Sequence, residues 1–202
     1  MYSTRCNLSS LAGAHQRRTE EWRSPHGQNF LFLSLEFAPR DTVLGWARSI
    51  INRPAYSNHQ VVLLTHSYLN YKNEHIEKEK YDLDDANYGK SVWKKLVQPS
   101  KNIALVFSGH IGAANDIKKH IGFRIDKNSA DKKVNQMTFN AQALGGGHQG
   151  SGGDAWLRVL EFLPDGKTVK VKTFSPLFAL STSIQDMAWR KESFDEFDIQ
   201  LE

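Results

Sequence analysis

Two histidines stand directly after apolar runs that are typical of buried strands. His66 follows residues 61–64 and Thr65, and His110 follows residues 103–107 with Ser108 and Gly109 between. An imidazole at the carboxyl end of a strand lies where α/β sheets collect ligands, because the strand is rigid and the loop after it can vary. A right-handed crossover between these strands places both ends at one edge of a sheet. Each histidine alone is more often a hydrogen-bonded core residue, but together they indicate a metal site.

Two imidazoles are an incomplete metal site, because Zn²⁺, Mn²⁺ or Fe takes further carboxylates, imidazoles or water. The residues that could complete it have no diagnostic spacing: Asn70, His75, Asp116, His120, Asn135, His148 and Asp154. Charged neighbours predict that His75 and His120 face solvent. Glycines beside Asp154, and Gly109 before His110, would let a backbone approach a ligand or take a positive φ. An Asx-turn explains Asp154 equally well.

The expected pocket therefore contains the metal ligands His66 and His110, with Gly109, Asn135 and Asp154 around them. No catalytic side chain is assigned. A serine nucleophile in a Gly-x-Ser-x-Gly elbow does not occur, and the single cysteine, Cys6, lies in a segment without clear periodicity.

The elements that must position these residues alternate between strand and helix. Short apolar runs at 30–37, 60–65 and 102–107 predict strands buried on both faces, and apolar residues at helical spacing predict helices at 41–51 and 88–97. This order is typical of an α/β layer. The second half predicts β structure, with an alternating run at 134–139 and a hairpin of 155–162 with 168–174 around Pro164-Asp165-Gly166. Residues 66–87 and 111–133 are predicted to be polar loops.

The length of 202 residues favours one domain, interpreted as residues 28–178, between a poorly ordered segment at 1–27 and a tail at 179–202. One cysteine excludes a disulfide framework and a thiolate zinc cluster. The net charge of +4 is scattered, which argues against nucleic-acid binding. The sequence contains no membrane span and no signal peptide, so as written we expect a soluble, cytoplasmic chain.

The chain resembles the calcineurin-like metallophosphoesterases, and specifically their carboxy-terminal half in a bacterial branch. The resemblance covers residues 30–176: FLFLSLEFAPRD, Trp46-Ala47, VVLLTHSYLN, SVWKKLV, NIALVFSGHIG, VNQMTFNAQ and GGDAWLRVLEFLPDGKTVKVKTFSP. It implies an α/β (α+β) fold, a partial β-sandwich flanked by helices. It also implies hydrolysis of a phosphoester substrate by two divalent metal ions (Mn, Zn or Fe), which activate water and neutralise phosphoryl charge. His66 would be the ligand of the Thr-His block, and His110 the first histidine of the Gly-His-x-His block.

The sequence departs from the family pattern in two ways. Gly112 stands where the second histidine of the Gly-His-x-His block belongs, and the Asp-x-His, Gly-Asp and Gly-Asn-His-Asp blocks of the family's amino-terminal half do not occur. Most ligands, including the bridging carboxylate, and the general acid are therefore missing. Neutral imidazoles alone leave a close pair of dications unscreened. We therefore expect a fragment of the family domain, with little or no phosphoesterase activity as this polypeptide.

Three interpretations of the function follow. The first is a metal-dependent phosphoesterase domain that is incomplete in this chain. The second is a catalytically inactive remnant that acts as a binding or structural module around the same pocket. A basic nucleic-acid binder is the third and ranks last. Loss of the front strands would also leave a sheet edge and apolar surface exposed, which predicts self-association.

Overall fold

A computed structural model describes residues 17–112, 116–147, 150 and 152–202. In these described ranges ten strands form two sheets, and the larger sheet has the order β1-β2-β3-β4-β6-β5. Its strands are β1 (Arg18–Arg23), β2 (Asn29–Ser34), β3 (Gln60–Leu64), β4 (Ile103–Ser108), β5 (Ile121–Lys127) and β6 (Lys133–Phe139). Strands β2, β3, β4 and β6 are parallel, and β1 and β5 run antiparallel along the two edges.

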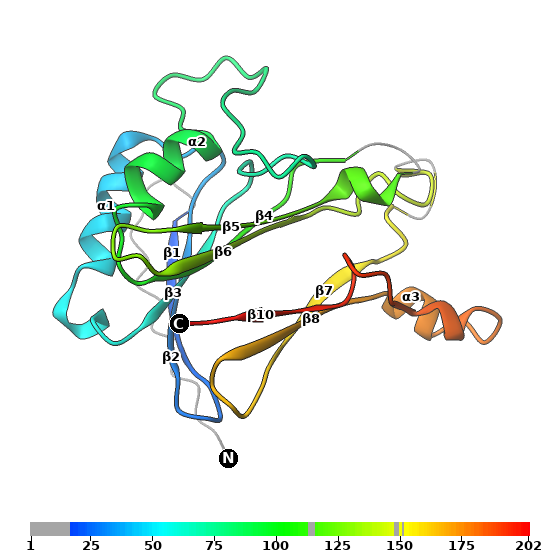
Figure 1. Cartoon of the computed structure of the whole chain (residues 1–202). Helices are drawn as coiled ribbons and strands as arrows, with labels where there is room; N and C mark the ends of the chain where they lie inside the picture. Colours follow the sequence, from blue (N-terminus) through cyan, green and yellow to red (C-terminus); the bar gives the residue numbers. More distant parts are fainter. Residues whose placement is uncertain (1–16, 113–115, 148–149, 151) are drawn as a thin grey trace.

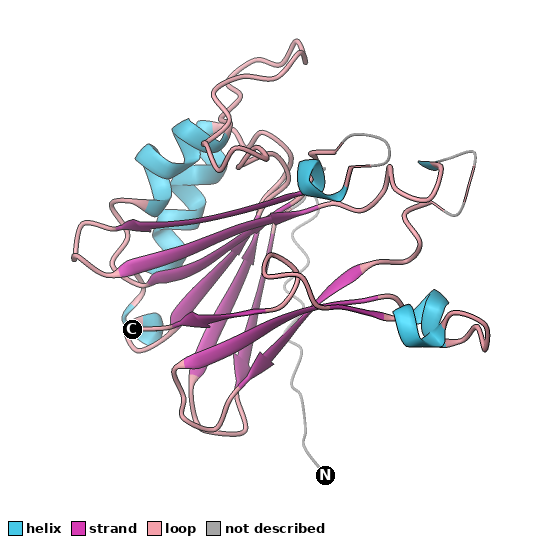
Figure 2. Ribbon diagram, turned by 45° about the vertical axis from the view of Figure 1, so that its right-hand side comes forward, coloured by secondary structure: helices cyan, strands magenta, loops and turns pink. Residues whose placement is uncertain are grey.

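The smaller sheet packs against one face of the larger one, and helices cover the other face (Figure 2). It consists of β7 (Leu157–Phe162), β8 (Thr168–Phe174), β9 (Trp189–Arg190) and β10 (Phe197–Gln200), with β8 paired to the other three. The covering helices are α1 (Asp41–Ile51), α2 (Gly89–Val92) and its π-helical continuation η2 (Trp93–Val97). Four shorter helices are η1 (Pro54–Tyr56), η3 (Ile117–His120), α3 (Pro176–Ala179) and η5 (Gln185–Met187).

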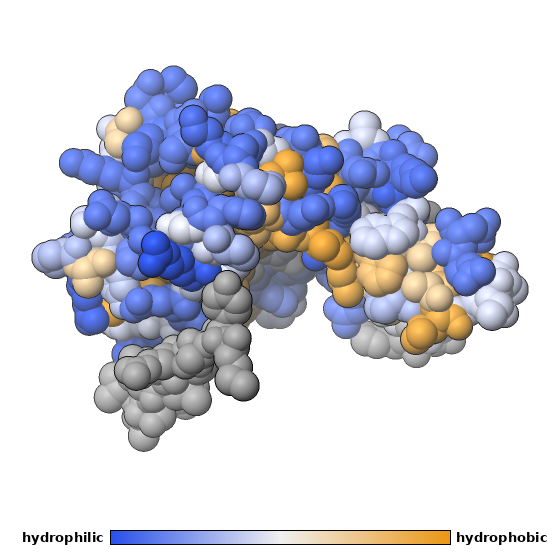
Figure 3. All heavy atoms as spheres, turned by 90° about the horizontal axis from the view of Figure 1, so that it is seen from below, coloured by the Kyte–Doolittle hydropathy of each residue, from blue (hydrophilic) through white to orange (hydrophobic). Residues whose placement is uncertain are grey.

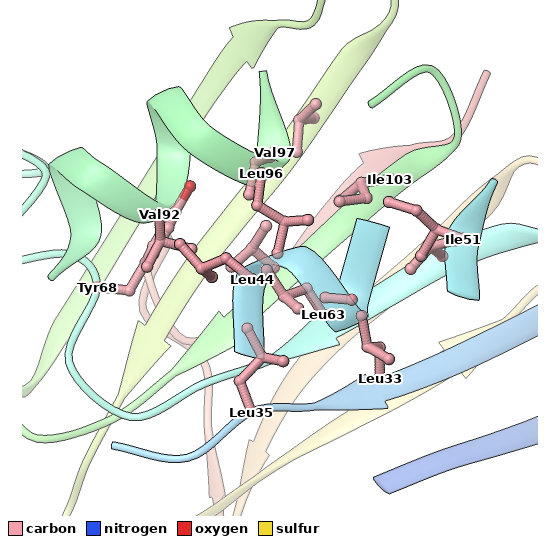
Figure 4. Close-up of a cluster of buried hydrophobic side chains, with 14 of the residues drawn as sticks. Leu33, Leu35, Leu44, Ile51, Leu63, Tyr68, Val92, Leu96, Val97 and Ile103 are labelled. Carbon is pink, nitrogen blue, oxygen red and sulfur yellow. The ribbon is translucent and has the colours of Figure 1, made fainter. Parts of the chain in front are cut away.

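The central strands are buried on both faces, as their continuous apolar runs predict. On β3, Val61 and Leu63 join the helix-side core, whereas Val62 joins the core between the sheets. Figure 4 shows Leu44 of α1 and Leu96 of η2 packed over Leu63 on the helix side. The mixed α/β architecture with a β-rich second half is therefore confirmed, as are the hairpin and the two helical segments.

Two edge strands differ from the sequence prediction. The segment interpreted as poorly ordered contains β1, which pairs with β2 through a turn at Ser24–Gln28 and places Trp22 against Phe30 and Phe162. Residues 1–16 lie outside the described residues. The predicted polar loop at 111–133 contains β5, which pairs with β6 along its whole length. Both strands lie at an edge of the sheet; β1 carries mostly polar side chains, and β5 mixes polar side chains with Ile121, Phe123 and Ile125.

The segment interpreted as a tail takes part in the smaller sheet, because β9 and β10 both pair with β8. Between β8 and β9 lies a lobe that contains α3 and η5 and projects to the right in Figure 1. Figure 3 shows apolar surface on this side of the molecule. The exposed apolar side chains of the lobe and its base are Leu157, Leu177, Leu180, Met187 and Trp189. The self-association expected from the sequence stays a prediction.

None of the helices in the described part of the chain combines the length and the apolar character that a bilayer crossing requires.

Candidate functional site

The two strand-end histidines meet at the carboxyl edge of the larger sheet. Strands β3 and β4 are parallel neighbours in which Leu64 pairs with Phe107, so the residues that follow them emerge side by side. The Nδ1 atom of His110 lies 2.9 Å from Nε2 of His66, and the ring centroids are 4.7 Å apart. The backbone N–H of Gly109 donates to the carbonyl of His66 over 3.0 Å, which ties the two strand ends together. The expected convergence of the two rings is therefore confirmed.

The strained residue at this edge is His110. Its φ is +66°, in the left-handed region that side chains other than glycine seldom occupy. The sequence suggests that Gly109 allows a close backbone approach or a positive φ, and the structure shows no positive φ at Gly109. A Cβ on Gly109 would meet only the carbonyl oxygen of Phe139, at an ordinary 3.7 Å. The turn that aims the imidazole at His66 is thus made by His110 itself.

The environment of the pair favours a neutral imidazole at His66. Partial burial lowers the pKa of His66 below its usual value, and the charge that His110 would carry lowers it further, whereas Glu79 opposes both effects. The Oε1 atom of Glu79 lies 4.0 Å from Nε2 of His110 and accepts a hydrogen bond from the hydroxyl of Ser67 over 2.8 Å. Neutral imidazoles keep the lone pairs that a metal ion or a hydrogen-bond donor requires.

The pair opens into a cavity of about 430 Å³. Its lining residues come from the ends of β2, β3 and β4 and from the loop after β3: Ser34, Leu35, Phe37, Leu64, Thr65, His66, Tyr81 and His110. The ring of Phe37 lies at the centre, 5.4 Å from His66, 5.3 Å from His110 and 5.0 Å from Tyr81 between centroids. The histidines therefore share their cavity with two aromatic rings.

A second cavity, of about 910 Å³, lies on the other side of His110. Its charged lining side chains are Glu74, Glu77, Lys78, Glu79, Lys90 and Arg124. Lys90 pairs with Glu77 within the wall, and Arg124 pairs with Asp126 behind it. The long loop between β3 and α2, which projects at the top of Figure 1, supplies most of this wall. His110 thus separates an aromatic cavity from a charged one.

Neither Asn135 nor Asp154 lines the cavity of the histidine pair. Asn135 lies on β6, is 2% exposed, and donates from Nδ2 to the carbonyl of Gln200 on β10 over 3.1 Å. Asp154 has a φ of +51°, and its carbonyl accepts the hydroxyl of Ser175 over 2.5 Å at the start of α3. The expectation that they belong to this pocket is therefore wrong, because each faces the smaller sheet or its flanking turn.

Two histidines expected in solvent are covered by the fold. His120 is fully buried, and its Nδ1 contacts the carbonyl of Asn140. His75 stacks on Trp93 with centroids 5.3 Å apart and contacts Oε1 of Gln136 over 2.7 Å. Burial lowers the pKa of His75, and its bond to Gln136 partly offsets this. Both expectations are corrected.

The remaining candidate ligands have local structural contacts. Asn70 closes a turn by accepting the backbone N–H groups of Lys72 and Glu74. Asp116 caps η3 by accepting the N–H of Lys118 over 3.2 Å. His148 lies outside the described residues.

The donor set at the pair fits part of a metal coordination shell. Two nitrogens bound to one tetrahedral ion, each at about 2.1 Å, are about 3.4 Å apart. The observed 2.9 Å separation needs only a small opening of the two rings. Within the described ranges no group of three or more histidine, cysteine, aspartate or glutamate residues could hold an ion. Among these residues, His66 and His110 can contribute two ligands to a site.

The sequence reasoning missed Phe37 and Tyr81. Phe37 lies shortly after β2, so the strand-end argument applied to a third parallel strand would have found it. Tyr81 is the single aromatic residue within the charged run EKEKYDLDD at 77–85. The charges of that run predict only an exposed loop, and nothing in the local sequence indicates that the Tyr81 ring reaches Phe37.

Comparison with known proteins identifies one distant relative. Over 153 residues, 76% of this chain, the sequence is 25% identical to the uncharacterized protein YvnB of Bacillus subtilis strain 168. The chain spans only 10% of that protein's length. No family model matches the chain, and no solved structure matches it.

Proposed function

We propose that this chain belongs to a calcineurin-like, metal-dependent phosphoesterase domain and contributes His66 and His110 to its divalent-metal site. The observation that carries the proposal is the 2.9 Å contact between the two rings at the ends of adjacent parallel strands. Two imidazole nitrogens held this close either share one hydrogen bond or share a cation. A divalent ion supplies charge to neutralise a phosphoryl group, and Glu79 lies near enough to orient His110.

The residues of this chain perform the supporting steps. The Gly109–His66 backbone bond and the left-handed turn at His110 fix the two ring planes before any ligand binds. Phe37 packs against both rings, with centroids 5.4 Å from His66 and 5.3 Å from His110. The charged cavity is also lined by His110.

A second candidate function is a binding module without catalysis. It is favoured by the finding that the described residues offer no group of three metal-ligating side chains. A site with two protein ligands binds an ion weakly and leaves the charge of a close second ion unscreened.

Calorimetric titration with Mn²⁺ and Zn²⁺ tests the metal site. Wild-type protein should bind an ion, whereas His66→Ala and His110→Ala should lose this binding. His59→Ala is the matched control, because His59 lines a different cleft beyond the amino end of β3 and should leave binding unchanged. Absence of binding to wild-type protein would contradict the proposal.

Hydrolysis of bis(4-nitrophenyl) phosphate with saturating metal then separates the two candidates. Turnover that disappears in both histidine variants identifies a phosphoesterase. Metal binding without turnover in the wild type identifies the binding module.

A further inference from the structure

The cavity beside the histidine pair has the composition of a site for a planar ring. Phe37 and Tyr81 meet edge to face, with centroids 5.0 Å apart and an interplanar angle of 79°. The Tyr81 centroid is also 5.8 Å from that of His110. Apolar and aromatic walls with a few polar groups at one end are typical of small-molecule sites, and about 430 Å³ lies within their range of volumes.

The exposure of Tyr81 is the second observation. Tyr81 is 50% exposed although its ring contacts Phe37, so one side remains uncovered beside the cavity. Its neighbours along the chain are charged, and the backbone around it belongs to no helix or strand. Tyr88, which directly precedes α2, also contacts Phe37, with centroids 6.1 Å apart, and is only 5% exposed. The aromatic cluster is therefore closed toward the helices and open toward the cavity.

We propose that this cavity binds the planar aromatic group of a phosphoester, a nucleobase or an aryl ring, which stacks on Tyr81 while the phosphate points toward His66 and His110. The inference rests on the proposed function, because it takes the histidine pair as the phosphate end of the site. Stacking on an aromatic side chain tolerates different rings, since each ring presents a π face. The cavity would then discriminate against substrates that lack an aromatic ring, such as a sugar phosphate.

Binding of uncharged fragments in metal-free, chelator-containing buffer tests the ring site apart from the metal. Saturation-transfer NMR should detect adenosine or phenol bound to wild-type protein, with the ring protons most strongly saturated, and should not detect ribose. Tyr81→Ala should weaken this binding about tenfold or more, and Tyr81→Phe should retain it. Tyr71→Ala is the matched control, because Tyr71 is a similarly exposed tyrosine of the same loop that lines the other cavity.

If adenosine binds and phenol does not, the ligand group is a nucleoside. If phenol binds and adenosine does not, it is an aryl group. Binding of both supports a site that accepts either ring. Ribose bound as well as adenosine, or Tyr81→Ala without effect, overturns the inference. None of these fragments carries a phosphate. A failed metal titration therefore overturns the proposed function but not the ring site. Failure of the fragments to bind overturns the ring site but not the proposed function.

Discussion

A buried polar network beneath the loop between β3 and α2 makes a quantitative prediction. Tyr68, fully buried, donates its hydroxyl to Oε1 of Gln136 over 2.7 Å, and His75 Nε2 reaches the same oxygen over 2.7 Å. Nε2 of Gln136 donates to Oδ2 of Asp126 over 2.8 Å. Burial raises the pKa of Tyr68 well above its usual value, so its hydroxyl remains a donor across the physiological range. Gln136 is therefore the centre of the network, and Tyr68 is one of its branches.

The two substitutions Tyr68→Phe and Gln136→Leu should differ in cost. Tyr68→Phe removes one hydrogen bond and leaves the Gln136 oxygen partnered by His75, which costs about 1 kcal/mol. Gln136→Leu leaves the buried Tyr68 hydroxyl without a partner and also removes the bonds to His75 and Asp126, which costs about 3 kcal/mol.

Urea unfolding followed by tryptophan fluorescence measures both values. Tyr71→Phe, at a tyrosine that is 46% exposed, serves as control and should change the free energy of unfolding by less than about 0.5 kcal/mol. If Tyr68→Phe costs as much as Gln136→Leu, Gln136 is not the centre of the network and the reasoning fails.

Three further perturbations follow from individual contacts. Because the pKa of His75 is lowered on folding, the folded state binds a proton there less readily than the unfolded chain. Stability should therefore fall as pH drops from about 6.5 through the lowered pKa. His75→Gln should flatten this slope in urea titrations at several pH values. Gly45→Ala should stabilise the fold by about 0.5–1 kcal/mol, because a Cβ there in α1 meets nothing within 4 Å. Gly89→Ala should cost about 3 kcal/mol or more in the same assay, because it places a Cβ 1.8 Å from the Tyr68 carbonyl oxygen. Arg158→Met should cost about 2–3 kcal/mol in thermal or urea unfolding, because the guanidinium holds two backbone carbonyls of the turn before β10, and an unchanged midpoint would refute that role.

The central layer of the fold follows from the sequence because its strands are buried on both faces. An unbroken apolar run such as Val61–Leu64 needs no knowledge of its partners to be interpreted as a strand. The edge strands could not be found in this way. Strand β10 is held by β8, about thirty residues earlier, and its own residues alternate too briefly to indicate a period. Such strands depend on pairing partners that local sequence does not identify.

The same distinction applies to the site. His66 and His110 could be placed together because the rule for parallel strands fixes where their ends emerge. Burial of His75 and His120 depends on Trp93 and Asn140, which lie 18 and 20 residues further along the chain, and the charges beside each histidine suggested solvent instead. Topology therefore predicted the pair, and local charge misassigned the two histidines that tertiary contacts cover.

The conformation of His110 gives a last prediction, which separates the cost of the turn from the chemistry of the ring. A residue other than glycine at φ +66° costs about 1 kcal/mol relative to glycine. His110→Ala keeps that cost and His110→Gly relieves it, so the glycine variant should be the more stable of the two by about 1 kcal/mol. His66 has no positive φ, so the order should reverse there, with His66→Ala more stable than His66→Gly.

Thermal or urea unfolding of these four variants measures both differences, and all four should lose metal binding equally. An alanine variant as stable as glycine at position 110 would contradict the left-handed turn. The expected order would mean that the chain keeps an imidazole where glycine is energetically cheaper. A strained side chain retained at a strand end is consistent with the proposed role of His110 as a ligand, and the ring also packs against Phe37, His66 and Tyr81.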